Sequence, residues 1–374
     1  MAIREWDDIF IPFNSLKALV HGKHFEAILS GQYLTPVVVN LDVSGQCPYN
    51  CPHCHHRAQI GKDRSLPFLD ERLARTFPAF MKNWIIRDSR PLGCCIVGSR
   101  GDALLFKGLP KLLRELHFAG IETGLVTNGY LFSDILIDHA THYCKFIGIS
   151  VDAGDSESYY KVHRSPNGAW HRVLDNLRTI VGRIAHYRLR NDTCYKFLIL
   201  PDSYHTLYQA CRIAKDIGVR WVQIRPADLS DEERAKIDID KVNEQIELAM
   251  NDLNAPGTFE IVGVRHKFTP DFKAILPSYC WLTALTVTIT SDGKCWPCVD
   301  RRWDEKTLLA DCGTGGGWQE LREAWGSAKH IKIVHNIINR GGKGPDCGIR
   351  CSNYGYDQLF RRVFLSDDMD RVLI

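Results

Sequence analysis

The stretch "PVVVNLDVSGQCPYNCPHC", residues 36–54, joins a run of β-branched and apolar residues to a loop that carries three cysteines. The run at 37–43 is typical of a strand buried on both faces. The loop then places Cys47, Cys51 and Cys54 within eight residues. This tight spacing favours thiolates bound to metal over disulfides. Three thiols leave one metal position without a protein ligand, as a catalytic site requires.

Length and composition indicate an ordinary globular protein with room for more than one core. The chain has 374 residues, 45% of them hydrophobic, and a net charge of +3. This charge is too small to indicate a nucleic-acid or anionic-membrane partner, and no apolar run reaches the roughly 18 residues of a membrane span. The first 20 residues carry Asp7 and Asp8 and lack the pattern of a signal peptide. We therefore expect a cytoplasmic protein.

Six apolar runs alternate with amphipathic stretches over the first two thirds of the chain. The runs lie at 37–43, 92–98, 121–127, 145–152, 194–200 and 219–225, and the helical patterns at 70–86, 107–119, 132–142, 170–190 and 205–217. This alternation predicts an α/β fold with a parallel sheet covered by helices. Periodicity alone does not distinguish an incomplete barrel from an open sheet. In both arrangements ligands bind at the carboxyl ends of the strands, where the three cysteines fall.

The pattern changes after Ala227, where a charged helical stretch leads into a second cysteine-rich region at 280–351. We place a domain boundary near residue 235. The predicted organisation is a lead-in at 1–36, a six-unit β/α domain at 37–235 and a small cysteine-rich α+β domain at 236–374.

The segment CPYNCPHC resembles the CxxxCxxC signature of the radical S-adenosylmethionine (radical SAM) superfamily. The resemblance implies a partial (β/α)6 barrel and a [4Fe–4S] cluster held by Cys47, Cys51 and Cys54. The open iron would bind the amino and carboxylate groups of S-adenosylmethionine (SAM). Reduction would cleave its sulfonium to a 5′-deoxyadenosyl radical that removes hydrogen from a substrate. A zinc site that takes His53, His55 or His56 as its fourth ligand stays open as an alternative.

The resemblance also implies contacts with SAM or substrate at other strand ends. The candidates are His53, Gly101, Asp102, Asn128, Ser150, Asp152, Arg164 and Arg225. Gly101 and Asp102 stand where the family often has a Gly-Gly-Glu turn, so Asp102 would accept from the SAM amino group. Asn128 precedes a glycine and could equally form a turn. Leu198 could pack on adenine or belong to the core.

The later cysteines resemble the auxiliary-cluster extension of the superfamily, called SPASM or, in its short form, twitch. The matching pieces are "TITSDGKCWPCVD", a helical stretch over 318–333 with a Trp-Gly-Ser element, and a late cysteine pair. The resemblance implies a second [4Fe–4S] cluster, with Cys280, Cys298, Cys347 and Cys351 as its ligands. A zinc ribbon that uses Cys295 in place of Cys280 is the alternative.

Two further cysteines in this region have a separate candidate role. Cys295 or Cys312 could donate hydrogen to a substrate radical, as a cysteine does in some radical SAM epimerases, and Cys312 could instead be a cluster ligand. The other cysteines sit beside apolar residues, where a free thiol behaves as a small hydrophobe. They are Cys94, Cys95, Cys144, Cys194 and Cys211.

We therefore expect a radical SAM enzyme of oxidoreductase or isomerase type. The expected reaction is dehydrogenation or epimerisation of a small molecule such as a sugar or aminocyclitol. Maturation of a ribosomally made peptide is the alternative, and a non-catalytic metal-binding module is a remote one. A flavodoxin or ferredoxin would supply electrons.

Overall fold

The computed structural model describes residues 15–54, 67–97, 101–227, 229–263 and 281–339. In this part of the chain one ten-stranded sheet has the order β10-β9-β8-β1-β2-β3-β4-β5-β6-β7. Neighbouring strands from β8 through β1 to β7 are parallel, and β9 and β10 are antiparallel additions. The predicted α/β fold with a parallel sheet is confirmed.

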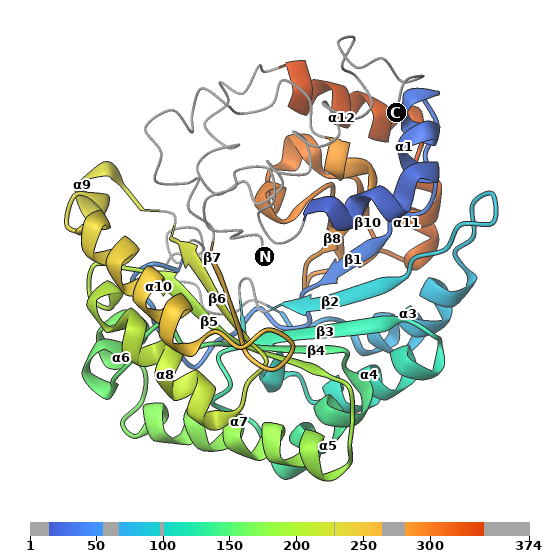
Figure 1. Ribbon diagram of the computed structural model, residues 1–374. Coiled ribbons are helices and arrows are strands. Elements are labelled where there is room, and N and C mark those ends of the chain that lie inside the picture. Colours follow the sequence, from blue (N-terminus) through green and yellow to red (C-terminus); the bar gives the residue numbers. More distant parts are fainter. Residues whose placement is uncertain (1–14, 55–66, 98–100, 228, 264–280, 340–374) are drawn as a thin grey trace, which may run out of the picture.

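The six predicted runs each form a strand. They are β1 (Val38–Leu41), β2 (Gly93–Val97), β3 (Glu122–Thr127), β4 (Phe146–Ser150), β5 (Asp192–Ile199) and β6 (Trp221–Pro226). The helices that link them are α3 (Glu71–Asn83), α4 (Leu109–Phe118), α5 (Asp134–Tyr143), α6 (Ser156–His163), α7 (Ala169–His186) and α8 (Leu207–Ile217). Figure 1 shows these helices ranged along the outer side of a curved sheet.

Burial along the strands distinguishes the two faces of the sheet. In β1, β2 and β6, buried residues alternate with partly exposed ones at every second position. Because successive side chains in a strand point to opposite faces, the buried set packs under the helices and the partly exposed set faces the concave side. The concave side is therefore a solvent-accessible lumen.

The sheet continues past residue 235 on both of its sides. After α9 (Asp231–Arg234), α10 (Ile239–Leu253) leads to β7 (Glu260–Gly263), which pairs with β6. Further along the chain, β8 (Thr286–Ile289) pairs in parallel with β1. Segments from the predicted second domain thus extend the sheet of the predicted first domain, while in the described part β7 and β10 remain at opposite edges and the barrel is open.

The strands β8, β9 (Lys294–Trp296) and β10 (Ala310–Asp311) form an antiparallel unit beside β1. Their first turn has Gly293 at a φ of +83°, and a Cβ there would lie 2.7 Å from the backbone nitrogen of Gly313. Glycine is the residue that tolerates both the dihedral and the close approach.

The helical stretch expected over 318–333 is two helices, which corrects the sequence prediction of one. They are α11 (Trp318–Ala324) and α12 (Ala328–Asn339). The break follows from Gly326, whose φ of +75° cannot continue a right-handed helix. It turns the Trp325 indole so that Nε1 donates to the carbonyl oxygen of Leu34 at 2.7 Å.

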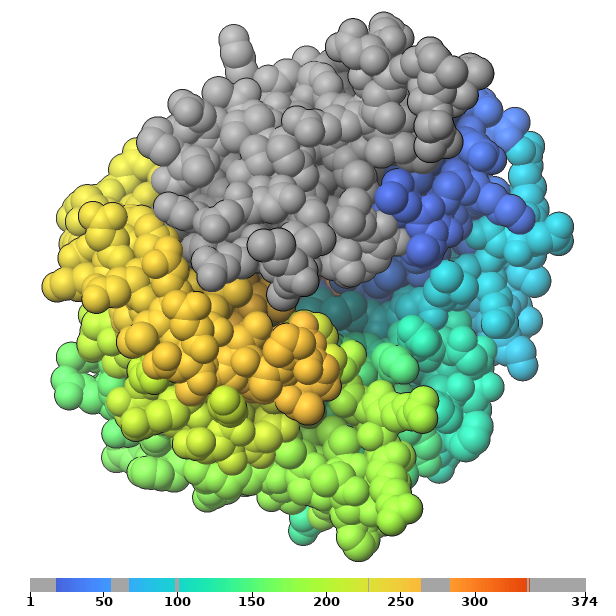
Figure 2. All heavy atoms as spheres, viewed as in Figure 1, coloured from blue at the N-terminus to red at the C-terminus, as the bar shows by residue number. Residues whose placement is uncertain are grey.

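Two buried contacts fix this C-terminal unit to the β/α units. The Trp318 ring stacks on Phe80 of α3 with centroids 5.5 Å apart, and its Nε1 donates to the Leu73 carbonyl at 3.1 Å. The Arg302 Nε lies 3.3 Å from Asp42 Oδ2, and both side chains are buried. Figure 2 shows the described segments from blue through green to yellow as one continuous surface. None of the described helices has the length and hydropathy needed to cross a bilayer.

The lead-in consists of η1 (Ser15–His21) and α1 (Gly22–Leu29). Phe25 and Ile28 of α1 pack with Ala284 and Leu285, which precede β8. The start of the chain as described is thus packed against its C-terminal region.

Candidate functional site

The three clustered cysteines lie on the loop that leaves the carboxyl end of β1. Burial raises the pKa of Cys47 to about 12. Burial, followed by the charges of Cys47 and Cys54, raises the pKa of Cys51 well above its ordinary value. Nearby like charges disfavour the thiolate form. A bound cationic cluster would remove the repulsion, because metal ligation favours the thiolate form.

The zinc alternative for this loop differs from a cluster in how closely its ligands must gather around one ion. Among the described residues, no three His, Cys, Asp or Glu side chains lie close enough together to hold one metal ion. A mononuclear zinc draws its ligands to about 2.0–2.3 Å, whereas thiolates of a four-iron cluster bind different irons. Of the zinc alternatives, His55 and His56 lie outside the described residues. His53 is described, and burial lowers its pKa to about 4.

His163, at the end of α6, contacts the cysteine loop and was not a candidate in the sequence. Its Nδ1 lies 3.3 Å from Cys51 Sγ, and its Nε2 lies 2.9 Å from the Val151 carbonyl oxygen. Burial, followed by the charge of neighbouring His53, lowers the pKa of His163 to about 3, so the ring is neutral. If Nε2 carries the proton and donates to Val151, Nδ1 accepts from the Cys51 thiol.

Asp102 ties three segments together at the carboxyl end of the sheet. Its carboxylate accepts hydrogen bonds from Thr127 Oγ1 at 2.8 and 2.7 Å, from the Asn128 N–H at 2.8 Å and from the Leu104 N–H at 3.0 Å. Its own N–H donates to the Gln46 carbonyl at 2.7 Å. The side chain is buried, and burial raises its pKa. Asp102 thus has a structural role, and its contact with the SAM amino group is still a prediction.

Gly101 lets the end of β2 approach the cysteine loop. A Cβ at this position would lie 2.3 Å from the Ser44 carbonyl oxygen and 2.5 Å from that of Gln46. Both are backbone atoms, so any larger residue would push the loop away from the sheet. Gly101 therefore sets the loop's position relative to β2.

Asn128 combines the two roles that the sequence left open. Its Oδ1 accepts from the Tyr130 N–H at 3.0 Å, which forms the turn, and its Nδ2 lies 3.7 Å from Cys47 Sγ. The amide thus also reaches the cysteine loop, as an N–H donor to sulfur.

Asp152 lies just after β4 in a left-handed conformation, with a φ of +57°. Its Oδ1 accepts from the Leu198 N–H at 2.7 Å, and its Oδ2 lies 3.6 Å from His163 Nε2. Burial raises its pKa to about 7. Strained non-glycine residues of this kind concentrate at functional sites. Ser150 pairs with Lys196 in the register of β4 and β5.

Arg164 and the two C-terminal cysteine candidates lie elsewhere. Arg164 ends α6 with a φ of +44° and is exposed. Cys295 is fully buried in the hydrophobic core, 3.6 Å from Cys312 Sγ, and burial raises its pKa well above the ordinary value. A hydrogen donor must reach its substrate, so this position offers no support for that role. Cys280, Cys347 and Cys351 lie outside the described residues.

The lumen holds a cavity of about 800 Å³. Its polar lining includes Asn40, Cys95, Lys196, Gln223, Arg225 and Cys298. The Lys196 Nζ donates to Gln223 Oε1 at 2.5 Å. Lys196 and Gln223 were not candidates in the sequence analysis. Each is a polar residue within an otherwise apolar strand pattern, and this pattern could have identified them.

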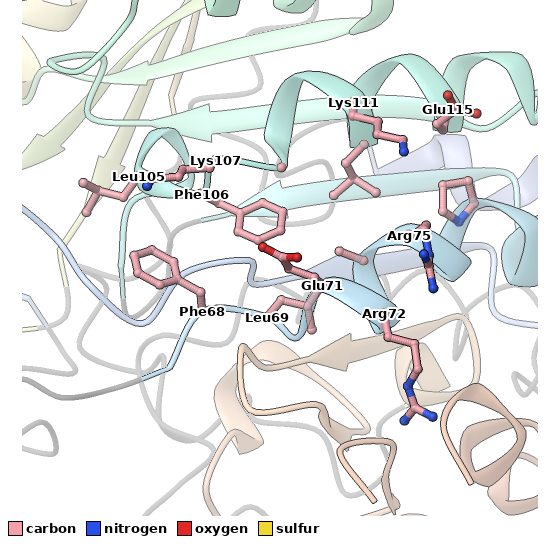
Figure 3. A pocket seen from close by; sticks show the side chains of 14 residues that line it. Phe68, Leu69, Glu71, Arg72, Arg75, Leu105, Phe106, Lys107, Lys111 and Glu115 are labelled. Carbon is pink, nitrogen blue, oxygen red and sulfur yellow. The ribbon is translucent and has the colours of Figure 1, made fainter. Parts of the chain in front are cut away.

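A second cavity of about 860 Å³ lies on the helical side, between α3 and α4. Figure 3 shows Arg72 and Arg75 of α3 with Lys107 and Lys111, around the rings of Phe68 and Phe106. It contains no thiol and lies outside the lumen, so it is not the site of the cysteine chemistry.

Comparison with known proteins identifies the segment that carries this loop. Residues 41–189 match the family model described as the Radical SAM superfamily. This segment is therefore similar to the radical SAM domain. The match begins in β1 and ends after α7, and thus contains the cysteine loop, Asp102, Asn128 and Asp152.

Curated relatives share this part of the chain at low identity. The UPF0026 protein of Helicobacter pylori is 22% identical over 157 residues, which are 41% of this chain and 50% of that protein. An S-adenosylmethionine-dependent nucleotide dehydratase of Lacinutrix mariniflava is 26% identical over 147 residues, which are 39% of this chain and 30% of that protein. The match thus spans half or less of the length of these relatives.

Solved structures share the fold over a longer stretch. Streptococcus suis SuiB bound to S-adenosylmethionine superposes with a TM-score of 0.62 at 13% identity, over 87% of this chain and 73% of that chain. The enzyme anSMEcpe with bound AdoMet gives a TM-score of 0.56 at 14% identity, over 88% and 97%. At these identities the comparison supports a shared fold alone, and it does not test the predicted auxiliary cluster.

Proposed function

We propose that this protein is a radical SAM enzyme that binds a [4Fe–4S] cluster through Cys47, Cys51 and Cys54 and acts on a substrate in the lumen. The observation that carries the proposal is the position of these thiols. They share a loop of the radical SAM domain at the carboxyl edge of the sheet whose concave face lines the cavity.

With cluster and SAM bound, this family's chemistry is reductive cleavage of the sulfonium and removal of a substrate hydrogen atom by the resulting 5′-deoxyadenosyl radical. The described residues supply a rigid support for that chemistry. Asp102 and Gly101 hold the cysteine loop against β2 and β3, while His163 contacts Cys51 from α6. Cys51 and Cys54 are partly buried, whereas Cys47 is exposed.

We infer a small molecule as the substrate, oxidised or epimerised in the lumen. The polar lining formed by Asn40, Lys196, Gln223 and Arg225 supports a substrate with several polar groups. The name of the Lacinutrix relative, a nucleotide dehydratase, is a precedent for a small polar substrate in a relative of this domain.

A peptide substrate is the second candidate. SuiB was solved with its precursor peptide SuiA, and anSMEcpe with the Kp18Cys peptide, on folds like this one. A peptide side chain could enter a lumen of this size in the same way as a small molecule. Purified enzyme offered both classes of substrate would discriminate between them, because only the consumed class would increase 5′-deoxyadenosine formation.

We further propose a second cluster with Cys280, Cys298, Cys347 and Cys351 as ligands. Its support among the described residues is Cys298, which is buried and lines the lumen. Cys295 instead lies in the core beside Cys312, so a zinc ribbon containing both Cys295 and Cys298 is less consistent with the structure. An auxiliary cluster near Cys298 could accept an electron from a substrate radical, as a net oxidation requires.

The test is anaerobic reconstitution with iron and sulfide, followed by incubation with SAM and dithionite. We expect about eight irons per chain, falling to about four in a Cys47→Ala/Cys51→Ala/Cys54→Ala variant. Cys211→Ala, which removes a buried thiol of α8, is the matched control and should keep all the iron. Wild type should form 5′-deoxyadenosine. Loaded protein that forms none would contradict the enzyme proposal and favour a metal-binding module.

A further inference from the structure

The lumen carries two cationic side chains on neighbouring strands. Lys196 of β5 pairs with Gln223 of β6, and Leu198 pairs with Arg225. Lys196 and Arg225 are therefore diagonal neighbours, and both line the cavity on the concave face. Two cations on one wall of an enclosed space create a positive potential that is stronger than it would be in open solvent.

The surroundings of Lys196 hold its ammonium group in the cavity. Its stem lies over Gly148, where a Cβ would approach Lys196 Cδ to 3.2 Å and the Phe146 ring to 2.9 Å. Its Nζ donates one hydrogen bond, to Gln223 Oε1. An ammonium group has three donors, and the side-chain amide of Gln223 presents two more from its nitrogen. This corner of the lumen is thus rich in donors.

The described lining of the cavity carries one carboxylate. Its carboxylate is Glu122, the exposed first residue of β3, at the amino end of the strand. Outside this lining, Asp152 acts on both Lys196 and Arg225, and Asp300 acts on Arg225. Burial is the first cause that lowers the pKa of both cations, and Arg225 also lowers that of Lys196. An anion between them would relieve both effects.

We propose that Lys196 and Arg225 bind an oxyanion of the substrate, a carboxylate or a phosphate, inside the lumen. Gln223 orients Lys196 toward it. Arginine offers a planar fork for such a group, and lysine adds a point charge. This inference rests on the proposed function, in which the lumen is the substrate site. Binding of the oxyanion can nevertheless be measured without the reaction.

The test is calorimetric titration of the full chain with inorganic phosphate and, separately, with succinate, at constant ionic strength. It is done on metal-free protein and on reconstituted protein with SAM. We expect saturable binding of at least one probe, weakened tenfold or more by Lys196→Met and by Arg225→Met. Lys196→Arg should retain most of the affinity. Lys145→Met, an exposed lysine just before β4, is the control and should leave the affinity unchanged.

Circular dichroism and the iron content of each variant show whether it folds and loads. Saturable binding of neither probe to wild type overturns the proposal, as does equal binding by the Met variants. If Lys196→Met weakens SAM binding as much as anion binding, the pair belongs to the cofactor site and the proposal is wrong. Failure of 5′-deoxyadenosine formation would instead contradict the proposed function, because anion binding is measured without that reaction.

Discussion

Replacing Asp102 tests whether this carboxylate supports the protein structure or contacts the cofactor. The sequence resemblance assigns it to the SAM amino group, whereas in the structure protein donors surround both of its oxygens. Oδ1 accepts from Leu104 N–H and Thr127 Oγ1, and Oδ2 accepts from Asn128 N–H and Thr127 Oγ1. Each carboxylate oxygen of Asp102 thus accepts a hydrogen bond from one backbone N–H.

The size of the effect follows from these bonds. In Asp102→Asn the amide nitrogen faces one of the two backbone donors, whichever way the amide turns, while the Thr127 hydroxyl can rotate to accept. One buried N–H then loses its partner, at a cost of about 1–3 kcal/mol. Burial raises the pKa of Asp102, so removal of the charge recovers part of this cost. We expect a loss of about 1–2 kcal/mol for Asn and about 4 kcal/mol for Asp102→Ala, which strands both donors.

The assay is urea unfolding of the metal-free full chain at pH 7 under reducing conditions, together with SAM titration of the reconstituted protein. Asp134→Asn is the control, because its side chain is 90% exposed in an ion pair with Arg183. It should change the unfolding free energy by less than about 0.5 kcal/mol. If Asp102→Asn were as stable as wild type but failed to bind SAM, the structural role would be refuted and the cofactor role supported.

Two further changes test the packing and the electrostatics. Trp318→Ala removes the ring stacked on Phe80 and the hydrogen bond to Leu73, so urea unfolding should show a loss of about 3–5 kcal/mol. Trp318→Phe should lose about 1 kcal/mol, and equal losses in the two variants would argue against the stack. Burial raises the pKa of Asp152 to about 7 in the folded chain, so folding retains a proton that the unfolded chain releases near pH 4. The unfolding free energy of metal-free protein should therefore fall by up to about 1.4 kcal/mol per pH unit as the pH rises toward 7, and Asp152→Asn should flatten that slope.

The sequence predicted the strands well because each is a compact run of β-branched and apolar residues. It missed β7, which is four residues long and lies in a region with a different composition, and although the resemblance implied a hairpin around Gly293, it missed the pairing of β8 with β1. Their pairing with β6 and β1 depends on contacts between segments distant in sequence, and local periodicity carries no information about such contacts. The boundary predicted near residue 235 follows the change in composition, whereas the sheet crosses it.

The site was predictable where a motif is local, and otherwise only in part. Cys47, Cys51 and Cys54 stand within one loop, but His163 reaches Cys51 across 112 positions, and no spacing rule connects them. The bond between Asp102 and Thr127 is likewise a product of strand order. Lys196 and Gln223 could have been predicted from the alternation of polar and apolar residues, because polar residues at every second position of a strand indicate a face that is not packed in the core.

The register of β4, β5 and β6 relates the lumen to the cysteine loop. Ser150, Lys196 and Gln223 form one row across these strands, and Leu198 and Arg225 stand two residues nearer the carboxyl edge. Asp152 joins this second row through the Leu198 N–H and contacts His163, the neighbour of Cys51. Two residues of strand span about 7 Å. An oxyanion held by both Lys196 and Arg225, as proposed, would lie between these two rows, within about 7 Å of the row that adjoins the cysteine loop.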